Sequence, residues 1–313
     1  MQKIGSRLGV AAVIATAFFW GSNHVVARSV RDMVPLPSLV FWRWLIGAVL
    51  LTLFAASSLS RAWCSLRHEL CSIATGGAIG VGLFSYLLLG GAYYSPALEV
   101  GLINATTPIW IALLGSMTGN ERVDRRVWRG LGFSLGGTLM IITKGDPSIV
   151  TGLRLSFGNL LSLLAAITFA WFSLRVRVWS RTVDVLALTV ATAWSGIILV
   201  MLPVYLISLL CGSGWLVQPS ADLVLASAAI LYTAVGPTML GNFLYIFGVG
   251  EIGPTKAATF LYLSPVFSAL MAVVWLDERL AWFHLAGIGM IAMGLWMITR
   301  SPSTSTAIGE RGD

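Results

Sequence analysis

The sequence predicts an all-α integral membrane protein, with ten transmembrane helices in two inverted five-helix repeats around a central cavity. Three observations lead to this prediction. Hydrophobic residues make up 57% of the 313 positions and charged residues only 11%, whereas roughly 25% charged residues are usual in soluble domains. Ten apolar runs follow one another along the chain, and part of the second half repeats the first at an offset of 157 residues.

The apolar runs set the expected helices. A helix needs about 20 apolar residues to cross the hydrocarbon core, and charged residues, Pro or Gly separate such runs here. We expect spans at Leu8–Ala27, Leu39–Ala56, Ser72–Ala92, Leu98–Thr118, Val127–Thr143, Leu155–Leu174, Val185–Leu210, Leu223–Val249, Thr255–Leu276 and Ala281–Thr299. The first run is expected to be a membrane helix rather than a cleaved signal peptide, because nine spans follow it and no convincing cleavage site is present.

The net charge of +7 is spread along the chain rather than gathered on one face, which argues against nucleic-acid binding. If the N-terminus is cytoplasmic, fourteen Lys and Arg residues fall inside and six outside, as the positive-inside rule favours. We therefore expect both termini in the cytoplasm, with residues 301–313 forming a disordered tail.

An internal repeat organises the helices. Pro108–Ile141 aligns without a gap to Pro265–Ile298 with ten of 34 positions identical, and each copy carries a Glu-Arg pair, at 121–122 and at 278–279. A weaker similarity relates Phe18-Phe19-Trp20 to Phe169-Ala170-Trp171. We expect repeats at 1–146 and 147–300. Because five helices is an odd number, the second copy is inverted, and such a pair can expose a central site to each side in turn, as carriers do.

Motifs for other functions are weak or absent. Three cysteines without a Cys-x-x-Cys pair support neither a disulfide framework nor a zinc site. The glycine-rich stretch 248–253 falls in a turn between two spans, which is the wrong setting for a nucleotide-binding loop. We therefore expect no enzyme, no catalytic residue, no cofactor and no metal. A membrane lipid enzyme is the least favoured alternative, since it would need clustered Asp or Glu.

Polar and aromatic residues inside the spans mark the expected substrate site. Trp20 and His24 lie four residues apart on one helix face, and lipid disfavours polar side chains without partners. The expected substrate-binding residues are Trp20, His24, Tyr86, Asn104, Trp110, Trp171, Asn242 and Tyr262. Each of them has an alternative role in packing or hydrogen bonding between helices. Gly76-x3-Gly80 and Gly132-x3-Gly136 predict close helix packing.

Several segments resemble one family. They are Ala-Phe-Phe-Trp-Gly at 17–21, Phe-Trp-Arg-Trp at 41–44, and the two Pro-containing segments that end in Glu-Arg at 122 and 279. Together they resemble the EamA branch of the drug/metabolite transporter superfamily, over roughly residues 8–299. That resemblance implies a multi-pass exporter of the bacterial inner membrane, built from two five-helix repeats and needing no obligatory protein partner.

Within that family, the chain as a whole and its Trp-rich helices are similar to the bacterial aromatic amino-acid exporters. We therefore expect export of aromatic amino acids by alternating access, with the substrate ring among Trp20, Trp171 and Tyr86 or Tyr262. Carriers of other amino acids, or of sugar phosphates and nucleotide sugars, are the alternatives. Facilitated diffusion and proton exchange through His24 are both open.

Overall fold

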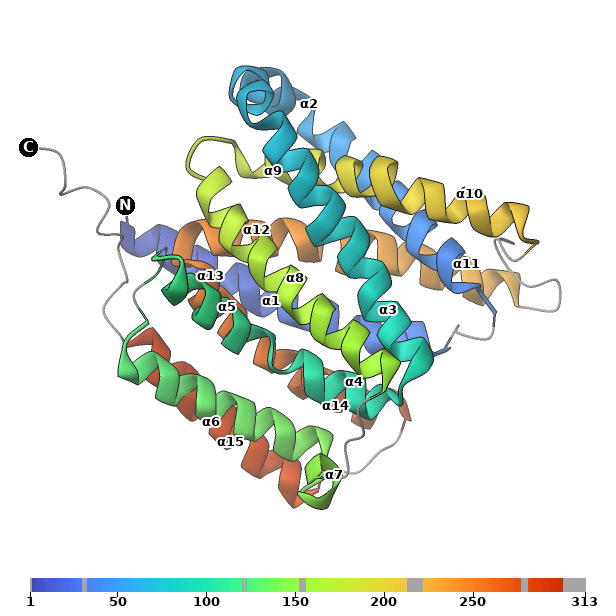
Figure 1. The fold of residues 1–313 in the computed structure, drawn as a ribbon. Coiled ribbons are helices and arrows are strands. Elements are labelled where there is room, and N and C mark those ends of the chain that lie inside the picture. The colour runs from blue at the N-terminus through green and yellow to red at the C-terminus, as the bar shows by residue number, and fades with distance from the viewer. Residues whose placement is uncertain are drawn as a thin grey trace, which may run out of the picture.

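The computed structural model describes residues 2–29, 33–119, 121, 123–151, 156–212, 222–276 and 281–300. Within these residues the chain is helical and contains no strand (Figure 1). The elements are α1 (Gln2–Ser29), α2 (Leu36–Gly77), η1 (Ala78–Leu83), α3 (Phe84–Tyr94), α4 (Ala97–Asn104), α5 (Thr107–Met117), α6 (Arg125–Ile142), α7 (Ser148–Thr151), α8 (Phe157–Trp179), α9 (Val185–Gly196), η2 (Ile197–Met201), α10 (Leu202–Leu210), α11 (Leu223–Thr233), η3 (Ala234–Leu240), α12 (Gly241–Ile252), α13 (Pro254–Phe260), η4 (Leu261–Leu263), α14 (Ser264–Leu276) and α15 (Trp282–Thr299).

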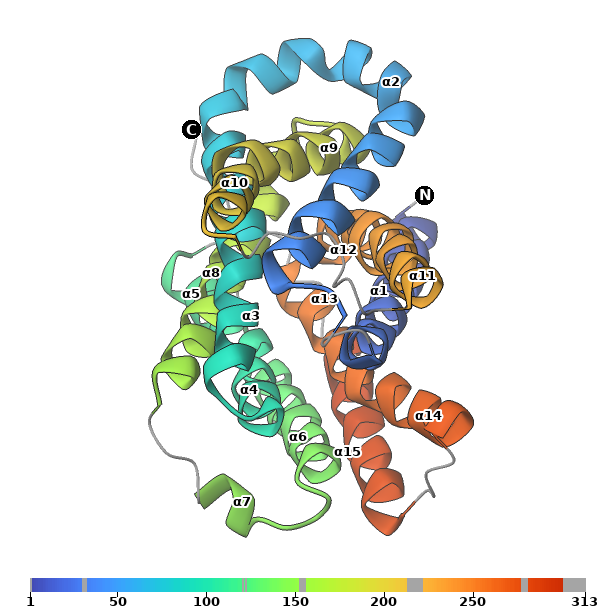
Figure 2. The ribbon, with the colours of Figure 1, turned by 90° about the vertical axis from the view of Figure 1, so that its right-hand side faces the viewer.

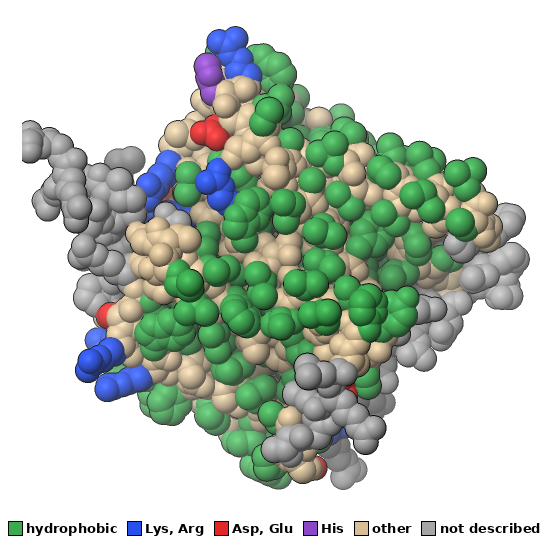
Figure 3. All heavy atoms as spheres, viewed as in Figure 1, with side chains coloured by type: hydrophobic (Ala, Val, Ile, Leu, Met, Phe, Trp, Pro, Cys, Tyr) green, Lys and Arg blue, Asp and Glu red, His purple; other side chains and the backbone are tan. Residues whose placement is uncertain are grey.

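The helices fit a multi-pass membrane protein. In the described part of the chain, six helical runs are long and apolar enough to cross a bilayer, at Leu36–Ala92, Leu98–Met117, Phe157–Trp179, Val185–Leu210, Leu223–Ile252 and Trp282–Thr299. All ten ranges expected from the sequence are largely helical. The number that cross the bilayer stays a prediction. Figure 3 shows hydrophobic side chains across the middle of one face, with Lys and Arg at its left edge.

One expected break is wrong. The sequence predicts a loop between Ala56 and Ser72, but α2 continues through it and joins η1 and α3 in a single helical run from Leu36 to Ala92. The linking residues contain neither Pro nor Gly, so nothing in the backbone ends the helix. The polar side chains of this segment favour contact with water, but they do not end the helix. Figure 2 shows α2 bending over as an arch above the bundle.

The helices pack in reciprocal pairs. α1 packs against α12 and α14, and α8 packs in the same way against α3 and α5. Two further pairs join the halves, α2 with α9 and α6 with α15. Figure 1 shows α6 and α15 side by side at the lower edge of the bundle. The contacts between the halves therefore follow one pattern twice.

The element boundaries repeat as well. α4, α5 and α6 begin at 97, 107 and 125, and α13, α14 and α15 begin 157 residues later, at 254, 264 and 282. The π-helical segments η1 and η3 begin at 78 and 234. The offset of 157 residues seen in the sequence thus also relates the helix starts from α4 onward.

For the first helix of each half, the glycine contacts give a different offset. Gly91 packs against Ser162 of α8, and Gly248, 157 residues later, packs against Val13 of α1. Ser162 follows Val13 by 149 residues. Trp20 is therefore equivalent to Phe169 in the structure, and not to Trp171 as the sequence comparison suggests.

Interrupted helices lie within several of the expected spans. η2 and η3 are π-helical segments, η4 is a turn of 3-10 helix, and α4 is separated from α5. η3 contains Pro237, and a proline follows the last residue of each of the other three interruptions by two positions, at 108, 203 and 265. Proline lacks the N–H that an α-helix needs and clashes with the preceding turn, so these helices change geometry there. Such interruptions leave backbone carbonyls free for side chains or ligands.

Candidate substrate site

A cluster of aromatic rings lies where helices of the two halves meet. Trp20 of α1 contacts Phe169 of α8 with ring centroids 5.7 Å apart and Tyr245 of α12 at 5.2 Å. Phe169 contacts Tyr245 at 5.1 Å, and Phe84 of α3 joins Phe169 at 5.0 Å. The edge-to-face and tilted arrangements are those that aromatic quadrupoles favour. We call Trp20, Phe84, Phe169 and Tyr245 the aromatic cluster.

Backbone carbonyls of the interrupted helix η3 border the aromatic cluster. Pro237 lies inside η3, and its carbonyl oxygen accepts hydrogen bonds from Trp20 Nε1 at 3.1 Å and Asn242 Nδ2 at 3.3 Å. Asn242 Nδ2 also donates to the carbonyl of Thr238 at 2.8 Å. The structure therefore brings together Trp20 and Asn242, two of the residues expected from the sequence, at one carbonyl of an interrupted helix.

A buried hydroxyl pair completes this side of the cluster. Tyr245 OH and Ser173 Oγ of α8 are 2.8 Å apart, and Ser173 Oγ donates to the carbonyl of Phe169, also at 2.8 Å. The pair joins α8 to α12 beneath the rings. Its hydrogen bonds satisfy polar groups that would otherwise be costly to bury.

Three further expected residues lie on the first half of the chain. Tyr86 and Trp110 pack, like Trp20, at the edge of one large buried cluster. The Tyr86 hydroxyl is buried and has no hydrogen-bond partner among the described residues, while Trp110 Nε1 donates to Thr106 Oγ1 at 3.0 Å. Asn104 is the half-buried last residue of α4. Trp110 and Asn104 therefore flank the interruption between α4 and α5.

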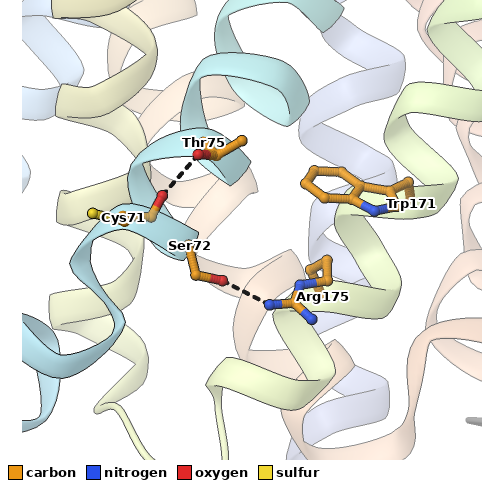
Figure 4. A pocket seen from close by; sticks show the side chains of 5 residues that line it. All are labelled: Cys71, Ser72, Thr75, Trp171 and Arg175. Atoms are coloured by element: carbon orange, nitrogen blue, oxygen red, sulfur yellow. Dashed lines mark hydrogen bonds between the residues drawn. The ribbon is translucent and has the colours of Figure 1, made fainter.

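Of the remaining expected residues, neither Tyr262 nor Trp171 has a ring contact with the aromatic cluster among the described residues, although Trp171 packs, like Trp20, at the edge of the same buried cluster. Tyr262, in η4, belongs to a second buried cluster with Ala112 and Val266, and within the described part of the chain its hydroxyl has no hydrogen-bond partner. Trp171 lines a separate pocket beside Arg175 (Figure 4). His24 belongs to α1, but its side chain is outside the described residues. The sequence predicts that a substrate ring stacks among residues that include Trp20 and Trp171. In the structure the ring that contacts Trp20 is that of Phe169, and not that of Trp171.

The expected substrate-binding residues leave out part of the aromatic cluster. Tyr245 follows Asn242 by three residues and so shares its helix face, and this spacing places it on the same polar stripe of that span. Phe84 carries no polar group, and nothing in the sequence distinguishes it from other apolar residues of a span. Phe169 belongs to the repeated Phe169-Ala170-Trp171 segment, but that alignment pairs it with Phe18 and not with Trp20. The described residues contain no group of three or more His, Cys, Asp or Glu that could hold a metal. The arrangement can bind rings by stacking and cations over ring faces.

Polar contacts close the bundle at the end where α1 begins. The carboxylate of Glu121, between α5 and α6, accepts hydrogen bonds from Thr255 Oγ1 and, at 3.3 Å, from the Thr255 N–H at the start of α13. Arg177 Nη1 of α8 donates to the carbonyl of Gly250 in α12. These contacts hold the ends of α8, α12 and α13 together. Burial raises the pKa of Glu121, although Thr255, Arg177 and Lys256 oppose that shift.

Comparison with known proteins identifies the family to which the chain belongs. The model of the EamA-like transporter family matches residues 7–143 and 156–300. The uncharacterized transporter YetK of Bacillus subtilis is 26% identical over 297 residues, which cover 95% of this chain and 87% of that protein. A probable amino-acid metabolite efflux pump of Salmonella typhimurium is 26% identical over 285 residues, covering 89% of this chain and 90% of the pump.

Two further comparisons agree with these. A probable terminal-alkyne amino-acid exporter of Streptantibioticus cattleyicolor is 24% identical over 293 residues, covering 93% of each chain. A crystal structure of a protein superposes with a TM-score of 0.73 at 18% identity, covering 93% of this chain and 96% of the other. At that identity, the superposition shows a shared fold and carries no information on substrate.

Proposed function

The chain belongs to the EamA-like transporter family, and on that premise we propose that it exports small amphipathic metabolites, above all aromatic amino acids, by alternating access. It is a membrane transporter rather than an enzyme. The observation that carries the substrate proposal is the aromatic cluster, because rings from both halves meet there beside a carbonyl of the interrupted helix η3. The names of the Salmonella and Streptantibioticus relatives support an amino acid as the cargo.

The proposed architecture is ten spans in two inverted repeats, 1–146 and 147–300, with both termini in the cytoplasm of a bacterial inner membrane. The reciprocal helix pairs and the recurring offset of 157 residues support the repeats. The excess of cations on one side supports the orientation. Inverted repeats provide two equivalent arrangements in which the central site opens to opposite sides.

Binding would use groups already next to each other. We place the substrate ring against Trp20 and Tyr245, and its carboxylate within reach of Trp20 Nε1 and Asn242 Nδ2. Its ammonium lies over a ring face or on the Pro237 carbonyl, since both attract cations. We place Tyr86, Asn104 and Trp110 on the opposite wall, since Tyr86 and Trp110 pack against the same buried cluster as Trp20 and Asn104 and Trp110 flank the interruption of α4 and α5. No covalent step is involved.

Efflux from reconstituted vesicles tests this proposal. Vesicles loaded with labelled phenylalanine or tryptophan should lose the label faster than protein-free vesicles. Trp20→Ala should slow efflux about tenfold, the effect of losing about 1.4 kcal/mol of binding. Trp63→Ala, on the exposed arch where Trp63 is 60% exposed, is the matched control and should transport normally. Efflux of aliphatic amino acids alone would overturn the aromatic preference, and no amino-acid efflux at all would overturn the substrate class.

A further inference from the structure

A second binding feature lies away from the aromatic cluster. A cavity of about 350 Å³ opens between the end of α2 and α8, lined by Cys71, Ser72, Thr75, Trp171 and Arg175. Figure 4 shows Thr75 and Ser72 on one wall and the Trp171 ring and Arg175 on the other. Cys71 and Thr75 are exposed. We call this cavity the α2–α8 groove.

The α2–α8 groove lies near one end of the bundle. Arg175 and Trp171 precede the last residue of α8, Trp179, by four and eight residues, which at 1.5 Å per residue is about 6 and 12 Å. This is the end at which α1 begins, and the proposed orientation makes it cytoplasmic. The groove therefore extends from headgroup depth into the outer part of the hydrocarbon layer.

The guanidinium of Arg175 is held in place by a hydroxyl group and an aromatic ring, and not by a carboxylate. Arg175 Nη2 donates to Ser72 Oγ at 2.6 Å, and its guanidinium lies 5.1 Å from the Trp179 ring centroid. Trp179 Nε1 donates to the same Ser72 oxygen at 3.1 Å. Among the described residues no carboxylate pairs with Arg175. A positive charge therefore faces the groove with N–H groups to spare.

The other polar groups also favour an anion. Ser72 Oγ accepts two hydrogen bonds, so its own proton is free to donate. The indole of Trp171 offers a further N–H, because an indole can only donate. No lining residue is a carboxylate. A zwitterionic amino acid would find no acidic partner for its ammonium group here, whereas a phosphate diester needs donors alone.

The opposite end of the bundle lacks this feature. By the offsets of 149 and 157 residues, Trp171 and Thr75 correspond to Ser22 and Tyr232, whose hydroxyl oxygens are 2.5 Å apart. Arg175 and Ser72 correspond to Val26 and Ala229, which pack in an apolar cluster. The fold itself does not demand a charged groove, so its presence at one end reflects what that end binds.

We propose that the α2–α8 groove binds the phosphate of an anionic phospholipid from the cytoplasmic leaflet. Arg175 and Ser72 hold the phosphate, and the glycerol backbone and upper acyl chains lie on the Trp171 ring. Anionic lipids give the cytoplasmic leaflet its negative surface potential, and basic pockets between helices on that side can hold lipid headgroups. Arg suits this role because its donors match phosphate geometry.

Lipid binding to the purified full-length protein tests the proposal. Phosphatidylglycerol should remain bound in native mass spectra and raise the apparent melting temperature, whereas phosphatidylcholine with the same acyl chains should do neither. Arg175→Gln should weaken phosphatidylglycerol binding about tenfold or more, since charge-assisted hydrogen bonds are lost. Arg300→Gln is the matched control. The Arg300 guanidinium also lies over a tryptophan ring, 4.7 Å from the centroid of Trp296, but Arg300 does not line the α2–α8 groove.

A second variant keeps the test independent of how Arg175→Gln folds. Thr75→Trp fills the groove from its exposed wall and leaves Arg175 and Ser72 in place, so it too should lose phosphatidylglycerol binding. Equal binding by wild type and both variants would overturn the proposal. So would displacement of the lipid by free phenylalanine or by inorganic phosphate at matched concentration. Because efflux plays no part in these measurements, failure here leaves the transport proposal to its own test.

Discussion

Replacing Gly137 by alanine should destabilise the bundle, because α6 and α15 approach each other through their backbones. A Cβ atom on Gly137 would lie 2.5 Å from the carbonyl oxygen of Gly287, and a Cβ atom on Gly287 would lie 2.6 Å from that of Gly137. A carbonyl held in a helix cannot rotate away. The two helices must therefore move apart to admit either methyl group.

The size of the effect follows from the distance. Ordinary contacts of a Cβ atom begin at 3.4 Å, so the helices must separate by about 0.9 Å, the difference from 2.5 Å. Overpacking of this kind costs about 1–3 kcal/mol. Alanine also stabilises a helix by about 1 kcal/mol relative to glycine through its higher helix propensity. A control Gly→Ala variant on the same helix has the same gain, so the difference between the two variants reports the clash alone.

Gly132 of α6 and Gly289 of α15 supply the control, because a Cβ atom at either would meet nothing within 4 Å. Relative to Gly132→Ala, we expect Gly137→Ala to lower the apparent melting temperature by about 2–6 °C, using about 2 °C per kcal/mol. Thermal scans of the detergent-purified protein, followed by size-exclusion chromatography, measure this. Equal melting temperatures for the two variants would refute the close approach. The double variant Gly137→Ala, Gly287→Ala should lower the melting temperature by less than the sum of the two single variants, since one separation of the helices relieves both clashes.

Two further predictions concern buried polar groups. Because burial raises the pKa of Glu121, its contribution to stability is full below the ordinary carboxyl pKa and is lost as pH rises through the raised value. Glu121→Gln should therefore flatten the fall in melting temperature as the pH rises above about 4, the ordinary carboxyl pKa, and an unchanged slope would contradict this. Tyr245→Phe removes the hydrogen bond to Ser173 and should lower the free energy of unfolding by about 1 kcal/mol. A denaturation midpoint equal to wild type would show that water or another group replaces it.

The positions of the helices were predictable because bilayer thickness sets the length of an apolar run. The expected span Val127–Thr143 differs from α6, Arg125–Ile142, by two residues or fewer at each end. The arch of α2 was not predictable from hydropathy. Charged and hydroxyl side chains indicate that a segment reaches water, but only the backbone chemistry of Pro and Gly ends a helix.

The helix contacts were predictable only in part. Gly76 and Gly80 do pack closely, against Trp179 and Phe172. The second expected pair was half wrong, since Gly132 faces open space while Gly136 meets only the tip of Met290. A small-residue pattern shows that a face permits close approach, but the partner helix decides which face is used. On α6 that face carries Gly130 and Gly137.

The same reasoning explains why the aromatic site escaped the sequence comparison. Aligning Trp20 with Trp171 uses an offset of 151 residues, whereas the glycine contacts of α1 and α8 give 149. A shift of two residues turns a helical side chain by about 200°, to the other side of α8. Phe169 therefore faces Trp20 across the pseudo-symmetric centre, and Trp171 faces the α2–α8 groove instead. Since only Trp20 brings an N–H donor to this ring pair, the two halves present different chemistry to a substrate, and we expect one bound orientation rather than two.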